Sequence, residues 1–206
     1  MEIYTNENKK TNTIKRFFIN NSKELLIALI IGIGAIIIWN YWKLDQENTL
    51  QKNAQSFEQI SSQFQTGSKQ TLINAERFAN ETNNIYGVLT NIELAKILVE
   101  KNDIINAEKK LLNALSIARL KNLKNLINVR LARVQLALNK TDQVLISLTK
   151  VESNRWSTII ENIRGDVLLK KGDIVGARRA YLKGIESNGS ETMKTILKFK
   201  INSLPS

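Results

Sequence analysis

The feature that most constrains this chain is an uncharged, apolar run between Glu24 and Lys43. Residues 25–42 read LLIALIIGIGAIIIWNYW, and ten of these 18 residues are Leu or Ile. A helix rises about 1.5 Å per residue, so the run would span about 27 Å, close to the roughly 30 Å hydrocarbon thickness of a bilayer. A buried core helix would usually carry a polar face, and this run has none. We therefore expect a single N-terminal transmembrane helix over residues 25–42.

The side chains within this run indicate how it would sit in a bilayer. Each Leu or Ile contributes about −0.5 kcal/mol to insertion, so ten of them favour insertion by about 5 kcal/mol. Aromatic rings gather at one end, at Trp39, Tyr41 and Trp42, and such rings prefer the headgroup layer. Ala28 and Gly32 have the spacing of a small-residue packing face. The residues that we assign to the membrane anchor are Leu25, Ile31, Gly32, Gly34, Ile38, Trp39 and Trp42.

Basic residues around the run predict its orientation. Five precede it, namely Lys9, Lys10, Lys15, Arg16 and Lys23. Only Lys43 and Lys52 follow it within about 20 residues, the range over which flanking charge sets orientation. This asymmetry places residues 1–24 in the cytoplasm and residues 43–206 across the membrane. A cleaved signal peptide is disfavoured because no pattern of small residues follows the apolar core.

The rest of the chain carries a helical repeat. Three units each have a small residue in their first helix: Ala95, Ala132 and Gly165. Their spacings of 37 and 33 residues bracket the tetratricopeptide period of about 34. Twelve positions later, each second helix has a small or β-branched residue: Ala107, Val144 and Ala177. Between the two lies Asn102, Asn139 or Gly172, which predicts a left-handed turn at the end of the first helix.

These patterns predict an all-α fold in which the transmembrane helix is followed by a tetratricopeptide-like solenoid over residues 43–206. A fainter unit around Ala75 precedes the three clear ones, and an apolar stripe from Met193 to Ile201 predicts a final capping helix. An irregular helical domain remains the alternative.

In a tetratricopeptide-like solenoid the first helices line a groove that suits a peptide or a partner helix. By register, the groove residues are Ile92, Lys96, Val129, Arg133, Asn162 and Asp166. The alternative is that Ile92 and Val129 belong to the core and that the charged residues are merely solvated.

Composition excludes several kinds of active site. The chain has no Cys and no His, so disulfides, thiolate metal sites, Cys nucleophiles and His general bases cannot form. We expect no enzyme, no cofactor and no metal site, although catalysis by Ser, Lys or carboxylates stays open as a rival.

The formal net charge is +11, and one basic cluster comprises Lys170, Lys171, Arg178, Arg179 and Lys183. Because the predicted topology removes this cluster from the cytoplasm, we expect no nucleic-acid partner.

Several short motifs carry a resemblance to a known family. They are Met1–Tyr4, Ile14–Phe18, Gly32-x-Gly34, Trp39-x-Tyr41-Trp42, Ala75–Ala79, Tyr86-Gly87, Asn128–Gln135, Arg164–Asp166 and Lys171–Asp173. In these motifs the chain resembles the ancillary subunits of the SecYEG translocon (YfgM-like proteins). The similarity keeps the motifs in order over essentially the whole chain. The Asn- and Lys-rich composition of this chain departs from the composition that is commoner in that family. Contacts made by surface charges are therefore the least transferable property of the resemblance.

The resemblance implies a single-span protein of the bacterial inner membrane with a cytoplasmic N-terminus and a periplasmic tetratricopeptide-like domain. It implies association with the SecYEG translocon and with a membrane-anchored periplasmic chaperone of the prolyl-isomerase-like type, besides the lipid bilayer. It also implies a link to an envelope-stress response regulator through the cytoplasmic segment. The expected function is therefore a non-catalytic adaptor between protein export and periplasmic chaperones. A structural scaffold of an unrelated envelope complex is the alternative.

Overall fold

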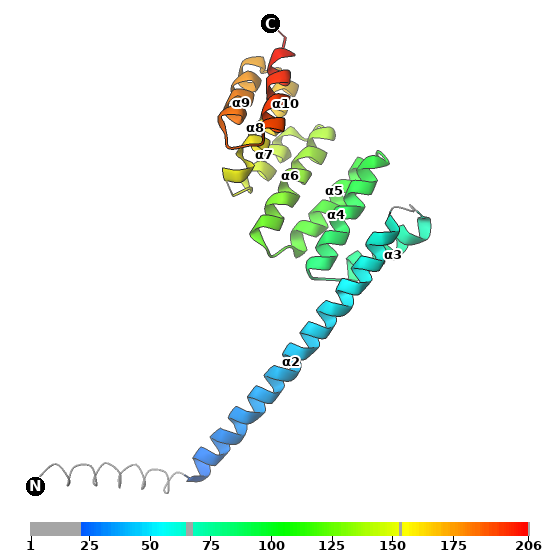
Figure 1. The fold of residues 1–206 in the computed structure, drawn as a ribbon, viewed down its shortest axis with the longest axis vertical. Helices are drawn as coiled ribbons and strands as arrows, with labels where there is room; N and C mark the ends of the chain where they lie inside the picture. The colour runs from blue at the N-terminus through cyan, green and yellow to red at the C-terminus, as the bar shows by residue number, and fades with distance from the viewer. Residues whose placement is uncertain (1–21, 65–67, 153, 206) are drawn as a thin grey trace, which may run out of the picture. The chain divides into compact units, whose positions relative to one another are not determined.

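The computed structural model describes residues 22–64, 68–152 and 154–205, and in these ranges the chain is helical with no strand (Figure 1). The elements are α2 (Ser22–Gln63), α3 (Lys69–Glu81), α4 (Ile85–Glu100), α5 (Ile104–Ile117), α6 (Lys121–Ala137), α7 (Thr141–Thr149), a 3₁₀ turn η2 (Asn154–Trp156), α8 (Ser157–Lys170), α9 (Ile174–Glu186) and α10 (Glu191–Asn202). The chain divides into two compact units, one that ends at Lys52 and one that begins at Asn53. The predicted all-α class is confirmed for the described residues.

The described part of the first unit is the N-terminal stretch of α2. Its large apolar side chains are exposed, for example Ile31 at 66 % and Ile38 at 71 %. The rings of Trp39 and Trp42 lie 5.7 Å apart and are tilted against each other. Over the residues that the structure describes, no helix is long and apolar enough to span a bilayer. Residues 1–21 of the predicted cytoplasmic segment lie outside the described residues, as does the side chain of Leu25.

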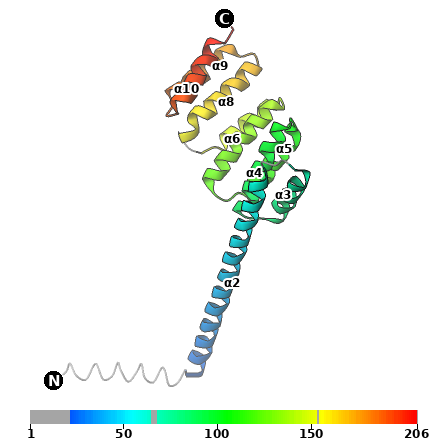
Figure 2. The same ribbon diagram turned by 45° about the vertical axis from the view of Figure 1, so that its right-hand side comes forward.

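The second unit is built from helical pairs, as the repeat predicts. Helices α4 and α5, α6 and α7, and α8 and α9 pack against each other as three successive pairs (Figure 1). Figure 2 shows the first and the last of these pairs from another side. The fainter first unit is also helical: Ala75 and Ala79 of α3 are buried against Leu94 of α4, with Ile60 and Phe64 packed beside them. At the other end, α10 packs on α9 and α8. A tetratricopeptide-like solenoid with a final capping helix is therefore the observed architecture.

The turns within the three pairs share one backbone geometry. Asn102 and Asn139 both have φ of 61°, and Gly172 has φ of 81°, so all three adopt the left-handed conformation. In each turn the next residue donates its N–H to a carbonyl five positions back, over 2.8–2.9 Å: Asp103 to Leu98, Lys140 to Gln135 and Asp173 to Leu168. This is the bonding pattern that closes a helix with a left-handed residue. The predicted turn positions are confirmed.

Small residues bring the paired helices close together. The side chains of Ala95, Ala132, Ala107 and Ala177 are at most 2 % exposed. Gly165 is the tightest of these positions, because a Cβ placed there would lie 2.2 Å from Cε1 of the Tyr181 ring. The Tyr181 side chain, in turn, is 1 % exposed. The glycine in α8 is therefore the complement of a large aromatic side chain in α9.

Asp173 caps the start of α9, and we expect its removal to weaken the last pair. Its Oδ1 accepts the Gly176 N–H over 2.8 Å. Loss of such a cap costs about 1 kcal/mol, so Asp173→Ala should lower the free energy of unfolding by that amount in urea titrations followed by circular dichroism. Asp142→Ala is the control, because Asp142 pairs with Lys171 on the surface and such pairs contribute about 0–1 kcal/mol. A larger loss for Asp142→Ala than for Asp173→Ala would contradict this reading of the cap.

Candidate partner-binding groove

A hollow of about 350 Å³ lies between α4 and α6. Its lining residues are Ile92, Ala95, Lys96, Val99 and Glu100 from α4, Leu111 from α5, and Arg130, Arg133 and Val134 from α6. Three of the residues assigned to the groove from sequence, Ile92, Lys96 and Arg133, are among them. Ile92 is 3 % exposed and also belongs to the hydrophobic core, so it forms the floor of the hollow.

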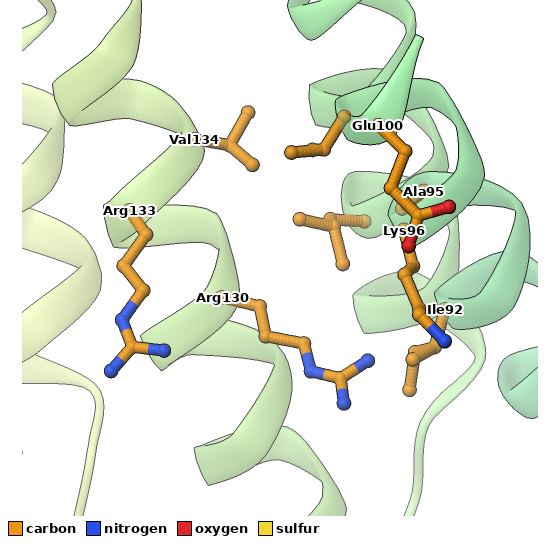
Figure 3. Close-up of a pocket in the computed structure, with 9 residues that line it drawn as sticks. Ile92, Ala95, Lys96, Glu100, Arg130, Arg133 and Val134 are labelled. Carbon is orange, nitrogen blue, oxygen red and sulfur yellow. The ribbon is translucent and has the colours of Figure 1, made fainter. Parts of the chain in front are cut away.

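The hollow combines an apolar floor with a charged rim. Ile92, Ala95 and Leu111 are buried beneath it, whereas the rim carries three cations, Lys96, Arg130 and Arg133, and one anion, Glu100. In Figure 3 the Arg130 side chain extends from α6 into the space that faces Ile92 and Lys96. Lys96 lies 3.9 Å from Glu93 in an exposed pair one turn away. The rim therefore has a net positive charge above an apolar surface.

A second hollow of about 450 Å³ lies at the other end of the same two helices. It is lined by Ile85 and Leu89 of α4, and by Leu120, Lys121, Asn122, Leu123 and Leu126 at the start of α6. The N-terminal turns of α4 and α6 thus face each other here, and their C-terminal turns face each other at the first hollow. We call the two hollows together the α4–α6 groove. One end of this groove is mainly apolar, and its one cation, Lys121, pairs with Glu152 at 2.6 Å. The other end carries three cations.

The other groove positions assigned from sequence lie elsewhere in the solenoid. Val129 is 2 % exposed and packs with Val144, Leu148 and Ile163 in the core between α6, α7 and α8. It lines neither hollow of the α4–α6 groove. Val129 is therefore a core residue, as the alternative interpretation of the sequence had it.

Asn162 and Asp166 of α8 are held by the final helix. The Lys200 Nζ of α10 donates to the Asn162 Oδ1 over 2.7 Å and to the Asp166 Oδ2 over 2.7 Å. The Asp166 Oδ1 also accepts the Tyr181 hydroxyl over 2.7 Å, and the Lys200 ammonium lies 5.5 Å from the centre of the Tyr181 ring. These polar groups are therefore engaged within the chain, and α10 packs on the part of α8 that the sequence assigned to the groove.

The Tyr181 hydroxyl is a donor in this cluster. Burial raises the pKa of Tyr181, and the hydrogen bond to the Asp166 carboxylate, together with the negative charge of that carboxylate, raises it further. Because the ordinary tyrosine pKa is about 10 and that of Tyr181 is raised, the hydroxyl stays protonated at neutral pH and donates a hydrogen bond to the Asp166 carboxylate. The cluster of Tyr181, Asp166 and Lys200 is thus a structural network that ties α10 to α8 and α9.

Sequence reasoning missed Arg130 and the apolar end of the groove. Helical spacing could have indicated the apolar end, because the lining residues on α4 recur every three or four positions: Ile85, Leu89, Ile92, Lys96 and Val99. It also missed Lys200, whose partners stand 34 and 38 residues earlier. No local pattern indicates that contact.

The α4–α6 groove is suited to binding a segment of another protein. Within the described residues there is no group of three or more acidic side chains placed to hold a metal ion. Buried carboxylates are neutralised by neighbouring cations: Glu161 contacts Arg164 at 2.6 Å and Lys183 at 2.9 Å. What the α4–α6 groove offers is apolar contact area and positive charge, the two means by which helical grooves hold partner segments.

Comparisons with known proteins agree with this architecture. Residues 15–206 match the tetratricopeptide repeat-like domain family. The chain is 37 % identical over 204 residues to a protein of Escherichia coli K12 named ancillary SecYEG translocon subunit, covering 99 % of each chain. Proteins of the same name match at 27 % identity in Haemophilus influenzae, covering 96 % of this chain and 97 % of that one, and at 28 % in Buchnera aphidicola from Acyrthosiphon pisum, covering 90 % and 97 %.

Proposed function

Because this chain belongs to the family of ancillary SecYEG translocon subunits, we propose that it is a non-catalytic adaptor of that translocon, anchored in the bacterial inner membrane. The single observation that carries this proposal is the similarity to the Escherichia coli protein over 99 % of both chains. An adaptor needs no reacting groups, and it needs a surface that can hold another protein. The α4–α6 groove is such a surface.

The proposed membrane anchor is the run from residue 25 to residue 42. Two observations support it: the run has no formal charge, and its large side chains, such as Ile31 and Ile38, are exposed. A contiguous exposed apolar surface of this kind marks contact with a membrane or with another protein. The excess of basic residues before the run supports a cytoplasmic N-terminus and a periplasmic solenoid.

The anchor would act by raising local concentration. A solenoid tethered beside the translocon meets partners at the membrane as though they were far more concentrated. We propose that these partners include a membrane-anchored periplasmic chaperone of the prolyl-isomerase-like type, and that the segment 1–24 contacts an envelope-stress response regulator. The resemblance of the sequence motifs to the translocon subunits supports both partners.

Affinity purification of the full-length tagged chain from a mild detergent extract tests the translocon association. We expect SecYEG subunits to be enriched over a control purification that uses an unrelated single-span membrane protein with the same tag. Recovery at the level of this control would overturn the proposal. Enrichment of a different envelope complex without SecYEG would favour the alternative, a structural scaffold for that complex.

A further inference from the structure

We propose that the α4–α6 groove binds an amphipathic helix of a partner protein whose first turn is acidic. The acidic first turn would lie at the cationic end, near Arg130, and the aliphatic residues would lie at the apolar end, near Leu89. This inference rests on the proposed function only in requiring a partner protein. It adds the chemistry, the conformation and the direction of the segment that binds.

The length of the groove suits a helix. Its lining extends from Ile85 to Glu100 along α4, and from Leu120, the residue before α6, to Val134 within α6. Helix α4 has 16 residues and therefore a length of about 24 Å, or more than four turns. A partner helix of similar length could place an apolar side chain on every turn against the floor. Spacing of three and four residues is how such helices engage a groove.

The polar groups of the lining favour a helix over an extended peptide. An extended segment needs partners for its own backbone N–H and C=O groups when it is buried. Lys and Arg side chains donate but do not accept, and among the lining residues of the two hollows, all within the described part of the chain, only Glu100 and Asn122 have a side-chain acceptor for backbone N–H groups. A helix satisfies its backbone internally, so it requires from the groove only apolar contact and charge.

Charge sets the composition and direction of the bound helix. Lys96, Arg130 and Arg133 outnumber Glu100 at the C-terminal turns of α4 and α6. Within the described part of the chain, neither Arg130 nor Arg133 lies in an ion pair with a carboxylate. Acidic residues are most favourable in the first turn of a helix. The bound helix would therefore start at the cationic end and run antiparallel to α4.

On α8, the equivalent positions Asn162 and Asp166 are already engaged by α10. Lys200 already neutralises Asp166 and binds Asn162, and α10 packs on α8. We therefore place the bound helix on α4 and α6, which allow a single short helix.

Fluorescence anisotropy with a designed peptide tests the proposal. The probe is a labelled 16-residue amphipathic helix with two glutamates in its first turn and leucines at helical spacing, titrated with the full-length chain in detergent micelles. We expect saturable binding that weakens with added salt, because exposed charges are screened. A second probe has lysines in place of the two glutamates, and a third has the glutamates in the last turn. Both should bind at least about tenfold more weakly.

The variant Arg130→Glu should weaken binding of the acidic probe about tenfold. Arg178→Glu is the matched control, because Arg178 is an exposed arginine on α9 outside the groove, and it should bind as the unchanged chain does. Lys96→Glu provides a second variant should Arg130→Glu alter the helical content seen by circular dichroism. Equal affinity for the three probes, or equal weakening by Arg178→Glu, would overturn the proposal.

Two further outcomes would also overturn it. If the chain dimerises in sedimentation experiments and Arg130→Glu abolishes the dimer, the occupant is a second copy. If no probe binds although SecYEG subunits co-purify with the chain, the adaptor role stands and this chemistry of the groove is wrong. The two proposals therefore fail independently.

Discussion

Tyr181→Ala is expected to lower the free energy of unfolding by about 3–5 kcal/mol, the usual cost of removing a large buried aromatic side chain. Tyr181 is 1 % exposed and is among the largest fully buried side chains of the described residues. Its ring packs against Gly165, where no Cβ can enter, and joins Leu197 and Leu204 in the core under α10. Because glycine leaves nothing to fill the space, the cavity would remain open. Urea unfolding of the full-length chain in detergent, followed by circular dichroism, measures the loss.

Two variants separate the causes of this effect. Phe199→Ala removes an aromatic ring from α10 that is 73 % exposed, and surface changes of this kind usually stay within about 0.5 kcal/mol. Tyr181→Phe keeps the ring and leaves Asp166 without one donor, which should cost about 1–3 kcal/mol. A loss for Tyr181→Ala no greater than that for Phe199→Ala would show that the ring does not support the last pair.

The repeat was predictable because its determinants are local. A left-handed turn residue and the small residues on either side of it lie within one hairpin, so Asn102, Asn139 and Gly172 could be recognised from spacing alone. Gly165 was recognisable as a close-approach position for the same reason. The identity of its neighbour, Tyr181, needed the packing of α8 on α9.

The groove was less predictable because its shape depends on contacts between pairs. Register placed Ile92, Lys96 and Arg133 on the inner wall, and these residues do line one hollow. The repeat register also assigned Asn162 and Asp166 to the groove, but Lys200 on the last helix, α10, binds both of them. A periodic pattern assumes that each pair is followed by another, whereas the end of a solenoid is closed by whatever helix comes last.

The double substitution Ile31→Arg and Ile36→Arg should release the chain from membranes. On the insertion scale, replacing Ile by Arg near the centre of a span costs about 3–4 kcal/mol. Two such changes exceed the roughly 5 kcal/mol by which the ten Leu and Ile residues favour insertion. We expect the unchanged chain to remain in the membrane pellet after alkaline carbonate extraction and the double variant to move to the supernatant.

The control carries the same two charges outside the proposed span. Leu44 and Leu50 lie on the same helix, α2, and are exposed at 55 % and 45 %, so Leu44→Arg with Leu50→Arg matches the test variant in helix, charge and side-chain size. It should stay in the pellet because residues 25–42 are intact. Release of this control together with the test variant would mean that attachment depends on charge along all of α2. Release of the unchanged chain by carbonate would mean that residues 25–42 do not anchor it, and that the adaptor reaches the translocon by protein contacts alone.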